Sequence, residues 1–422
     1  MQNKENFSNF KSSKSRLMGL FLGHKNSMSN IGIVLLLIAI VLHSLAGLFL
    51  AIVQRLLKPI VLIRVGRIYN QRLGHFIMEL DWYQATNLKS KRRLPFELNL
   101  FFLSGESSNV FLERIVKANL HLISRNFLIG VFAVNRIVRG GGKYLIAFPI
   151  RPTDFRYLDN SPPGYTFSDI EHLSARESLV EAGINPDEPI VCFFVRDSAY
   201  EDKFFQTMNQ NSTRYRDCDV VNFEKSMEFL ANHGYQVFRM GKYGVKPLSV
   251  GHPKIFDYTF SHIKNDFLDF YISSKCEFAV ATDSGSMMLP IFFRKPLLLV
   301  NVPAFHGILN GKCLTLFQFK TFLDVKSGKE ITLLDLIKRG VPEFETNDAF
   351  MNAGIVLQEN SSNEVLNAVK EMMILIGDDN FKSNEYHLTQ EVFNLRLKSI
   401  GFNDISGKLA LSWLKQHPSF LK

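Results

Sequence analysis

Short apolar runs alternate with amphipathic segments through the C-terminal half of the chain. Four of the runs have the length and apolar content of buried strands: 190–195, 235–241, 278–282 and 296–301. The segments around them predict helices at 168–182, 221–234, 267–275 and 286–294. Ser168 and Glu171 have the spacing of a capping box at the start of the first helix. Strands that alternate with helices in this way form a parallel, doubly wound sheet.

The N-terminal half begins with a similar unit. Residues 60–65 predict a strand, Gly66 a loop, and Leu73 the start of an amphipathic helix. Further along, 107–128 predicts a helix and 145–149 a strand, whereas the Pro- and Asp-rich tract 151–167 is typical of a linker. The C-terminal third is predicted to be helical. We therefore expect two Rossmann-like domains and a helical tail, at 59–160, 161–375 and 376–422.

Residues 31–53 form an uncharged run of helix-forming and apolar residues, preceded by a basic segment at 1–30. A helix of this length is long enough to cross a bilayer, so 31–58 predicts a membrane anchor. Both flanks are basic, and the positive-inside rule gives no orientation. A monotopic insertion with both flanks on the anionic leaflet is an equal alternative, and a buried core helix is a third.

Charge and cysteine content narrow the class of partner. The net charge of +9 favours an anionic partner, which is a nucleic acid, an acidic lipid surface or a phosphorylated small molecule. No zinc-finger spacing or aromatic RNA-binding motif is present, so nucleic acid is the weakest of the three.

The four cysteines are scattered without paired spacing. They predict buried, reduced thiols of a cytosol-facing domain, with neither disulfides nor a metal site.

Polar residues follow each predicted strand, where an open parallel sheet binds its ligands. The turn 282–286, TDSGS, combines a glycine with hydroxyl and carboxylate side chains that suit phosphate oxygens. Arg196 and Asp197 end another strand and form either a diphosphate site or a structural ion pair. Arg239 and Gly241 end a third. The loop after the first strand could face a negatively charged or polyhydroxyl ligand, and the alternative interpretation is a solvated basic turn. Its residues are Gly66, Arg67, Asn70, Arg72 and His75.

Two other motifs are weaker. The glycines at 139–143 lack the spacing of a phosphate-binding Walker loop and predict a hairpin. Asp217 and Asp219 have the spacing of a metal-binding DxD motif. They precede a predicted helix, so we interpret them as helix N-terminal charges and keep a metal site as the alternative.

These strand-end motifs together resemble those of GT-B glycosyltransferases. From about Pro59 to the C-terminus the chain is similar to a bacterial family of glycosyltransferases encoded in surface-polysaccharide (O-antigen and capsule) gene clusters. The motifs that show this similarity are IRVGRIYNQRLGH, VCFFVRDSAY and TDSGSMMLPIFFRKPLLLVN. A more distant similarity is to fucosyltransferases that use GDP-fucose. Gly66, Asn70 and Gln71 match their G-x-x-x-N-Q loop, and Arg196 matches their donor-diphosphate arginine. Phe194 stands where many members have histidine.

The resemblance implies two Rossmann-like domains around a cleft, no essential metal and no cofactor besides a nucleotide-sugar co-substrate. If the reaction inverts configuration, a base must take the proton of the acceptor hydroxyl. By position the candidates are His75, Glu79 and Asp81; helix spacing puts His75 and Glu79 on one face, which makes them the predicted catalytic residues and favours a structural role for Asp81. The resemblance places the acceptor-side loop at Gly66, Asn70, Gln71 and Arg72. It places the donor at Arg196, Asp197, Tyr200, Arg239, Gly241, Thr282, Asp283, Ser284, Gly285 and Ser286.

The leading hypothesis is a hexosyl- or fucosyl-type glycosyltransferase that acts on a lipid-linked or surface-polysaccharide acceptor. Its expected location is the inner membrane, with the catalytic domain facing the cytoplasm, and no nucleic acid partner is expected. One alternative is a non-catalytic sugar- or nucleotide-binding component of a polysaccharide assembly complex. The other is a metal-dependent GT-A-type transferase that uses Asp217 and Asp219.

Overall fold

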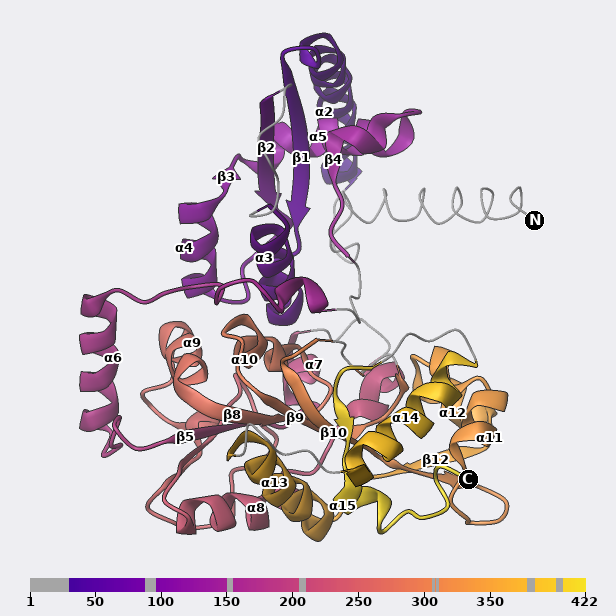
Figure 1. Ribbon diagram of the computed structural model, residues 1–422. Coiled ribbons are helices and arrows are strands. Elements are labelled where there is room, and N and C mark those ends of the chain that lie inside the picture. Colours follow the sequence, from indigo (N-terminus) through magenta and orange to yellow (C-terminus); the bar gives the residue numbers. More distant parts are fainter. Residues whose placement is uncertain are drawn as a thin grey trace. The chain divides into compact units, whose positions relative to one another are not determined.

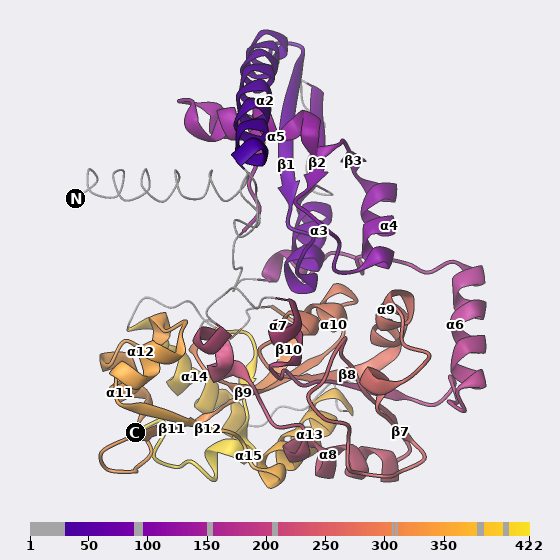
Figure 2. The same ribbon diagram turned by 180° about the vertical axis from the view of Figure 1, so that it is seen from behind.

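The computed structural model describes residues 30–87, 96–149, 155–204, 210–305, 308, 311–377, 384–399 and 405–422. The chain divides into two compact units (Figures 1 and 2). Unit 1 comprises Met1–Gln71 and Ser90–Phe148, and unit 2 comprises Arg72–Lys89 and Pro149–Lys422. Helix α3 (Leu73–Asn87) follows the first strand of unit 1 in the sequence, yet its contacts place it in unit 2.

Unit 1 is built on a parallel sheet with the strand order β3-β2-β1-β4. The two long strands are β1 (Val61–Ile68) and β2 (Phe96–Leu103), and the two short ones are β3 (His121–Leu122) and β4 (Leu145–Ile146). This order is that of one Rossmann-type half, as the sequence predicted. Gly66 lies within β1 and not in a loop. A Cβ there would come within 2.6 Å of the Phe101 ring on β2, so glycine leaves the space that this buried ring occupies.

Three helices complete unit 1: α2 (Asn30–Leu57), α4 (Val110–Asn119) and α5 (Arg125–Ile137). The prediction of one helix over 107–128 is wrong. The Asn109 side chain caps α4 by accepting from Leu112 N at 2.8 Å. The chain then turns extended at Leu120, because His121 and Leu122 pair with β2.

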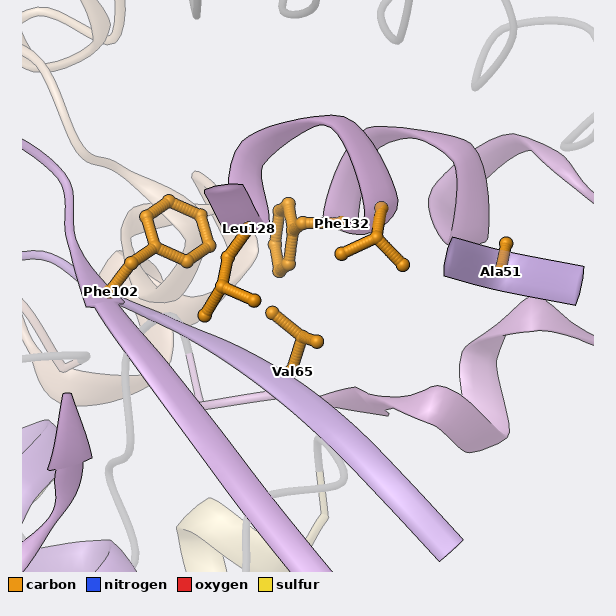
Figure 3. Close-up of a cluster of buried hydrophobic side chains, with 6 residues drawn as sticks. Ala51, Val65, Phe102, Leu128 and Phe132 are labelled. Atoms are coloured by element: carbon orange, nitrogen blue, oxygen red, sulfur yellow. The ribbon is translucent and has the colours of Figure 1, made fainter. Parts of the chain in front are cut away.

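The core of unit 1 forms where α2 and α5 pack on the sheet (Figure 3). Ala51 of α2 meets Val65 of β1, Phe102 of β2 and the α5 side chains Leu128, Val131 and Phe132. Gly47 and Gly130 lie at the crossing of the two helices. A Cβ on Gly47 would lie 2.3 Å from the Gly130 carbonyl carbon, so only glycine allows this backbone-to-backbone packing.

The prediction of a membrane-spanning helix at 31–58 is not supported. In the part of the chain that the structure describes, no helix combines the length and the apolar character that a membrane span requires. The residues of the predicted basic segment 1–29 lie outside the described ranges.

Unit 2 contains a seven-stranded parallel sheet with the order β13-β10-β9-β8-β5-β6-β7. Counted along the chain from β5, the order β7-β6-β5-β8-β9-β10 is the 3-2-1-4-5-6 order of a doubly wound Rossmann sheet. The predicted strands are confirmed as β5 (Ile190–Phe194), β6 (Gln236–Arg239), β8 (Cys276–Ala281) and β9 (Leu297–Val302). The other members are β7 (Ile255–Phe256), β10 (Leu314–Phe319) and β13 (Lys408–Leu409).

Helices cover both faces of this sheet (Figures 1 and 2). One face carries α8 (Val221–Asn232) and α13 (Ser362–Gly377), and the other carries α9 (Asp266–Lys275) and α10 (Met288–Phe292). Helix α6 (Asp169–Glu181) begins with the predicted capping box, in which Ser168 N donates to Glu171 Oε2 at 2.9 Å and Glu171 N to Ser168 Oγ at 3.3 Å.

The C-terminal third is not wholly helical. It contains the antiparallel pair of β11 (Thr321–Asp324) and β12 (Ile355–Gln358) beside five helices among the described residues. Besides α13, these are α11 (Leu333–Lys338), α12 (Asn347–Asn352), α14 (Asn384–Lys398) and α15 (Leu411–Leu414). All four cysteines are free thiols, and burial raises the pKa of Cys218 to about 12.

His417 fastens the C-terminal segment to the rest of unit 2. Its Nδ1 lies 2.8 Å from Glu330 Oε1 and its Nε2 lies 2.7 Å from Glu364 Oε1. Burial alone would lower the pKa of His417, but the hydrogen bonds and charges of the two carboxylates raise it to about 9. The imidazolium is therefore bound on both sides at neutral pH.

We expect His417→Gln to lower the free energy of unfolding by about 1–3 kcal/mol at pH 7, because the variant loses charge-assisted hydrogen bonds. The folded pKa lies above the unfolded value, so this stabilisation is complete below about pH 6.5 and is lost as the pH rises through about 9. Urea unfolding of both proteins at pH 7 and pH 10 tests this. Exposed His233→Gln is the control. A stability difference that is equal at both pH values would contradict the ionic role.

Candidate functional site

The TDSGS turn lies at the carboxyl end of β8, next to the end of β5. Thr282 N donates to Phe194 O at 3.0 Å, and Arg196 N donates to Thr282 Oγ1 at 2.9 Å. Thr282 is fully buried. These bonds join the two strand ends, which the sequence predicted to share one edge of the sheet.

Asp283 is buried, and one of its carboxylate oxygens receives no hydrogen bond from the described residues. Its side chain belongs to a residue only 9% exposed, and among the described residues no group hydrogen-bonds to Oδ2. Beside it, Ser284 Oγ lies 3.0 Å from Ser286 Oγ. A carboxylate withdrawn from water without a hydrogen-bond donor destabilises a fold, so its presence at a strand end points to donors supplied by a ligand.

The helix expected after this turn is shorter than the sequence indicated. A 3-10 turn, Gly285–Met287, leads into α10, and Ser284 makes no side-chain capping bond. Backbone dipoles of so short a helix contribute little to anion binding. The TDSGS side chains therefore carry more of the site than the helix terminus does.

The first turn of α3 packs against the TDSGS turn. A Cβ on Gly74 would lie 2.7 Å from Gly285 Cα, so glycine at both positions lets the two backbones meet. His75 follows Gly74 and is half-buried, and Glu79 lies one turn further along and is buried. Both candidate bases therefore lie on the helix whose start meets this turn.

Asp81, also on α3, is engaged in an ion pair. Arg294 Nη1 and Nη2 lie 2.8 and 2.7 Å from its two carboxylate oxygens. Burial raises the pKa of Asp81 to about 6, although the Arg294 hydrogen bonds and charge act to lower it. This carboxylate joins α3 to the turn after α10.

Arg196 and Lys320 converge on Asp217. Arg196 Nε donates to Asp217 Oδ1 at 3.0 Å, and Lys320 Nζ donates to the Asp217 carbonyl oxygen at 2.7 Å. Lys320 follows β10, is only 3% exposed, and forms an ion pair with no carboxylate in the described part of the chain. An ammonium that has lost its water and has only a neutral acceptor is poised for an anion.

Arg239 is buried, and its guanidinium binds groups in the loop after β6. Its Nη2 lies 3.6 Å from Asp197 Oδ2, and its Nη1 lies 3.3 Å from Asp257 Oδ2 and donates to Lys246 O at 2.6 Å. Asp197 Oδ2 also accepts from Val245 N at 2.9 Å. Arg239 and Asp197 are thus bound to each other, whereas Arg196 pairs with Asp217, so the ion pair that the sequence offered as an alternative, Arg196 with Asp197, is not the one that forms.

A tyrosine pair stands over the same loop. Tyr200, on α7 (Ala199–Phe204), has its ring centroid 6.3 Å from that of Tyr243. The ammonium of Lys203 lies 4.1 Å from the Tyr243 centroid. Gly241 permits this loop to approach Thr259, whose Oγ1 would be 3.1 Å from a Cβ at that position.

The acceptor-side loop predicted after β1 has mainly structural contacts. Asn70 is fully buried, and its amide donates to Gly105 O at 2.7 Å and accepts from Gly105 N at 3.1 Å. Gln71 is exposed and packs beside Gly105, whereas Arg72 is half-buried. Asn70 therefore fastens the end of β1 to the loop after β2.

Asp217 and Asp219 have different partners. Asp217 pairs with Arg196, whereas Asp219 lies 2.9 Å from Lys246 Nζ, and the hydrogen bond from Lys246 lowers the pKa of Asp219. No cluster of three or more metal-binding side chains occurs within the described ranges.

Sequence reasoning missed Lys320 and a polar network near it. Asn301 N donates to Asn360 Oδ1 at 3.0 Å, Asn360 N donates to Asn301 Oδ1 at 2.6 Å, and Gln318 Nε2 donates to Asn360 Oδ1 at 3.0 Å. Asn301 takes a left-handed φ of 57° at the end of β9. The signal for Lys320 was present as a lysine directly after the apolar run LTLFQF, which had not been predicted as a strand.

Comparisons with known proteins add context. No family model matches the chain, and no curated protein matches it. Among solved structures it is similar to a glycosyltransferase family 9 protein from Veillonella parvula, at 11% identity over 74% of this chain and 97% of the other, with a TM-score of 0.39. It is also similar to E. coli ADP-heptose LPS heptosyltransferase II, at 11% identity over 56% and 84%, with a TM-score of 0.34.

Proposed function

We propose that this protein is a glycosyltransferase of the GT-B type that uses a nucleotide-sugar donor. The observation that carries the proposal is the pair of unsatisfied groups on one edge of the unit 2 sheet. Among the described residues, no carboxylate pairs with the buried cation Lys320, and no group donates a hydrogen bond to Oδ2 of the buried Asp283. A nucleotide sugar carries an anionic diphosphate directly beside sugar hydroxyls, and it satisfies both groups at once.

The proposed reaction assigns a role to each group. Lys320 and Arg196 bind the diphosphate and stabilise the negative charge that develops when the bond from the anomeric carbon to the diphosphate oxygen breaks. Asp283 accepts hydrogen bonds from sugar hydroxyls. The acceptor oxygen bonds to the anomeric carbon, and its proton passes to a base. His75 is our first candidate because Gly74 touches the TDSGS turn, with Glu79 second.

The remaining parts of the donor and the acceptor follow from the surroundings. Tyr200 and Tyr243 offer an aromatic surface for the nucleobase. We propose a lipid-linked or surface-polysaccharide acceptor and a location on the cytoplasmic side of the inner membrane, supported by the resemblance of the strand-end motifs to polysaccharide-cluster enzymes. The diphosphate would be bound without metal, because cationic side chains are available at the site.

Donor binding tests the proposal. The purified protein is titrated with ADP-, GDP-, UDP-, dTDP- and CMP-sugars by calorimetry, with and without manganese. We expect one nucleotide class to bind without metal and Lys320→Met to weaken it by about 10- to 100-fold, the value of a charge-assisted hydrogen bond. Arg214→Ala removes an exposed arginine paired with Asp202 and is the matched control.

Three outcomes would overturn the proposal. No binding of any nucleotide sugar would remove the donor site. Binding only with manganese, lost in Asp219→Asn, would favour the metal-dependent alternative. Binding without turnover on any lipid-linked or polysaccharide acceptor would favour a non-catalytic binding component.

A further inference from the structure

Helix α2 presents a continuous apolar face to solvent. Seven of its side chains are 49–73% exposed and form what is here named the α2 stripe: Val41, Leu42, Leu45, Leu48, Phe49, Ile52 and Leu56. They recur every three or four residues, so they line one side of the helix. Folded proteins rarely leave so many large apolar side chains together in water, and such a surface marks an interaction site.

The opposite side of α2 is held rigidly by unit 1. Gly47 and Ala51 pack against α5 and the core beneath it (Figure 3). Near the C-terminal end of α2, Asn135 of α5 donates to Gln54 Oε1 at 2.7 Å and accepts from Arg55 Nη1 at 3.2 Å. Since these contacts occupy the other side, the stripe cannot be buried by rotating the helix.

Cations gather where the C-terminal ends of α2 and α5 meet. Lys58 follows α2, and Arg136, Arg139 and Lys143 lie at or just after the end of α5; all four are exposed. The Tyr144 ring lies under Arg55 at 4.8 Å and under Lys143 at 5.5 Å, which joins the two ends. Exposed Ile60, Ile137 and Val138 lie among these cations in the sequence.

Acidic residues are absent from the sequence of this region. No Asp or Glu occurs from residue 6 to 78 or from residue 125 to 152. These two segments therefore combine large apolar side chains with positive charge, and the acidic residue near them on β2, Glu97, is paired with Arg64. That combination is complementary to a bilayer with anionic headgroups, which accepts apolar side chains and attracts cations. A second copy would instead bring equal positive charges together.

We infer that unit 1 binds an anionic lipid bilayer through this face, with α2 lying in the plane of the interface and not crossing it. The α2 stripe enters the boundary between headgroups and acyl chains, and Lys58, Arg136, Arg139 and Lys143 contact lipid phosphates. The inference deepens, and rests on, the membrane location within the proposed function.

Sedimentation of the full chain with lipid vesicles tests the inference. We expect binding to vesicles that contain phosphatidylglycerol, weak binding to pure phosphatidylcholine, and loss of binding as salt rises. Leu45→Glu/Phe49→Glu should reduce vesicle binding at least tenfold, because each change places a charge in the acyl boundary. Arg136→Ser/Arg139→Ser should reduce binding to anionic vesicles by about fivefold per cation.

The controls separate this surface from the rest of the chain. Ile170→Glu/Leu173→Glu alters exposed apolar residues of α6, at 81% and 60% exposure, and should leave vesicle binding unchanged. Every variant keeps residues 1–29, so a difference between variants belongs to the α2 face. Donor binding and the thermal unfolding midpoint are measured on each variant, so a failed lipid test is distinguished from a failed transferase proposal or from misfolding.

Two results would overturn the inference. One is vesicle binding that is absent, or equal in the stripe variant and the wild type. The other is a dimer in light scattering that becomes a monomer in Leu45→Glu/Phe49→Glu, which would assign the stripe to a second copy of the chain.

Discussion

Replacing Asp283 with asparagine is expected to reduce kcat/KM for sugar transfer by about 100-fold while leaving the fold equally stable or more stable. Asp283 is buried and its Oδ2 accepts no hydrogen bond from the described residues, so the folded protein without donor bears the desolvation cost of that oxygen. An amide of the same shape avoids much of that cost but accepts weaker hydrogen bonds from sugar hydroxyls. Initial rates and urea unfolding on the same preparations measure both effects.

The opposite signs of the two effects make the Asp283 experiment decisive. Asp335→Asn is a suitable control, because Asp335 is a partly exposed helix-capping partner whose pKa is lowered by the hydrogen bond from Lys338. It should lower stability slightly and leave transfer unchanged. If Asp283→Asn instead loses stability and keeps full transfer, the carboxylate is structural.

Arg294→Ala is expected to lower the free energy of unfolding by about 3–5 kcal/mol at pH 7. Asp81 is fully buried, and Arg294 is the cation that binds both of its oxygens. Removing the guanidinium leaves the buried carboxyl group without the cation that stabilises its charged form. It also removes a bond to Ser161 Oγ at 3.0 Å and bonds to two carbonyl oxygens. Denaturant unfolding of the variant measures the loss.

Acidity should partly rescue this variant. The pKa of Asp81 is already raised from 3.8 to about 6 in the folded protein, and loss of Arg294 raises it further. Because the carboxyl pKa is raised by folding, the folded state keeps this proton at pH values where the unfolded state has lost it. The loss of unfolding free energy caused by Arg294→Ala is therefore smaller at pH 5, where Asp81 is mostly protonated, than at pH 7. Asp81→Asn combined with Arg294→Ala should destabilise less than the two single changes summed. Additive losses, equal at both pH values, would argue against the buried charge as the cause.

Local sequence patterns predicted correctly those helices and strands whose boundaries depend on their own residues. The strands β5, β6, β8 and β9 lie inside a parallel sheet that is covered on both faces, so each contains consecutive apolar residues that are easily recognised. The capping box at Ser168 is equally local. The 107–128 helix failed because its break at Leu120 is set by pairing of two residues with β2, a long-range contact that helix periodicity does not report.

The candidate site was predicted in part. Arg196 and the TDSGS turn were predicted as site residues because they follow predicted strands, and in the structure a hydrogen bond from Arg196 N to Thr282 joins them. Sequence position could not tell which cations have partners. Arg239 is engaged by Asp197 and Asp257 from other loops, whereas Lys320 has no carboxylate partner among the described residues. The difference depends on where distant loops fold.

The sequence by itself determined the parallel α/β class, the strand ends that carry polar groups and the apolar, acid-free N-terminal region, because these follow from composition and short-range periodicity. Only the tertiary structure decided that α3 belongs to unit 2, that Asp81 is paired with Arg294, and which side of α2 faces solvent. It also decided that, among the described residues, Asp283 Oδ2 receives no hydrogen bond and Lys320 has no carboxylate partner. The physical reason is that partnership and burial arise from contacts between residues far apart in the chain, and no local pattern records them.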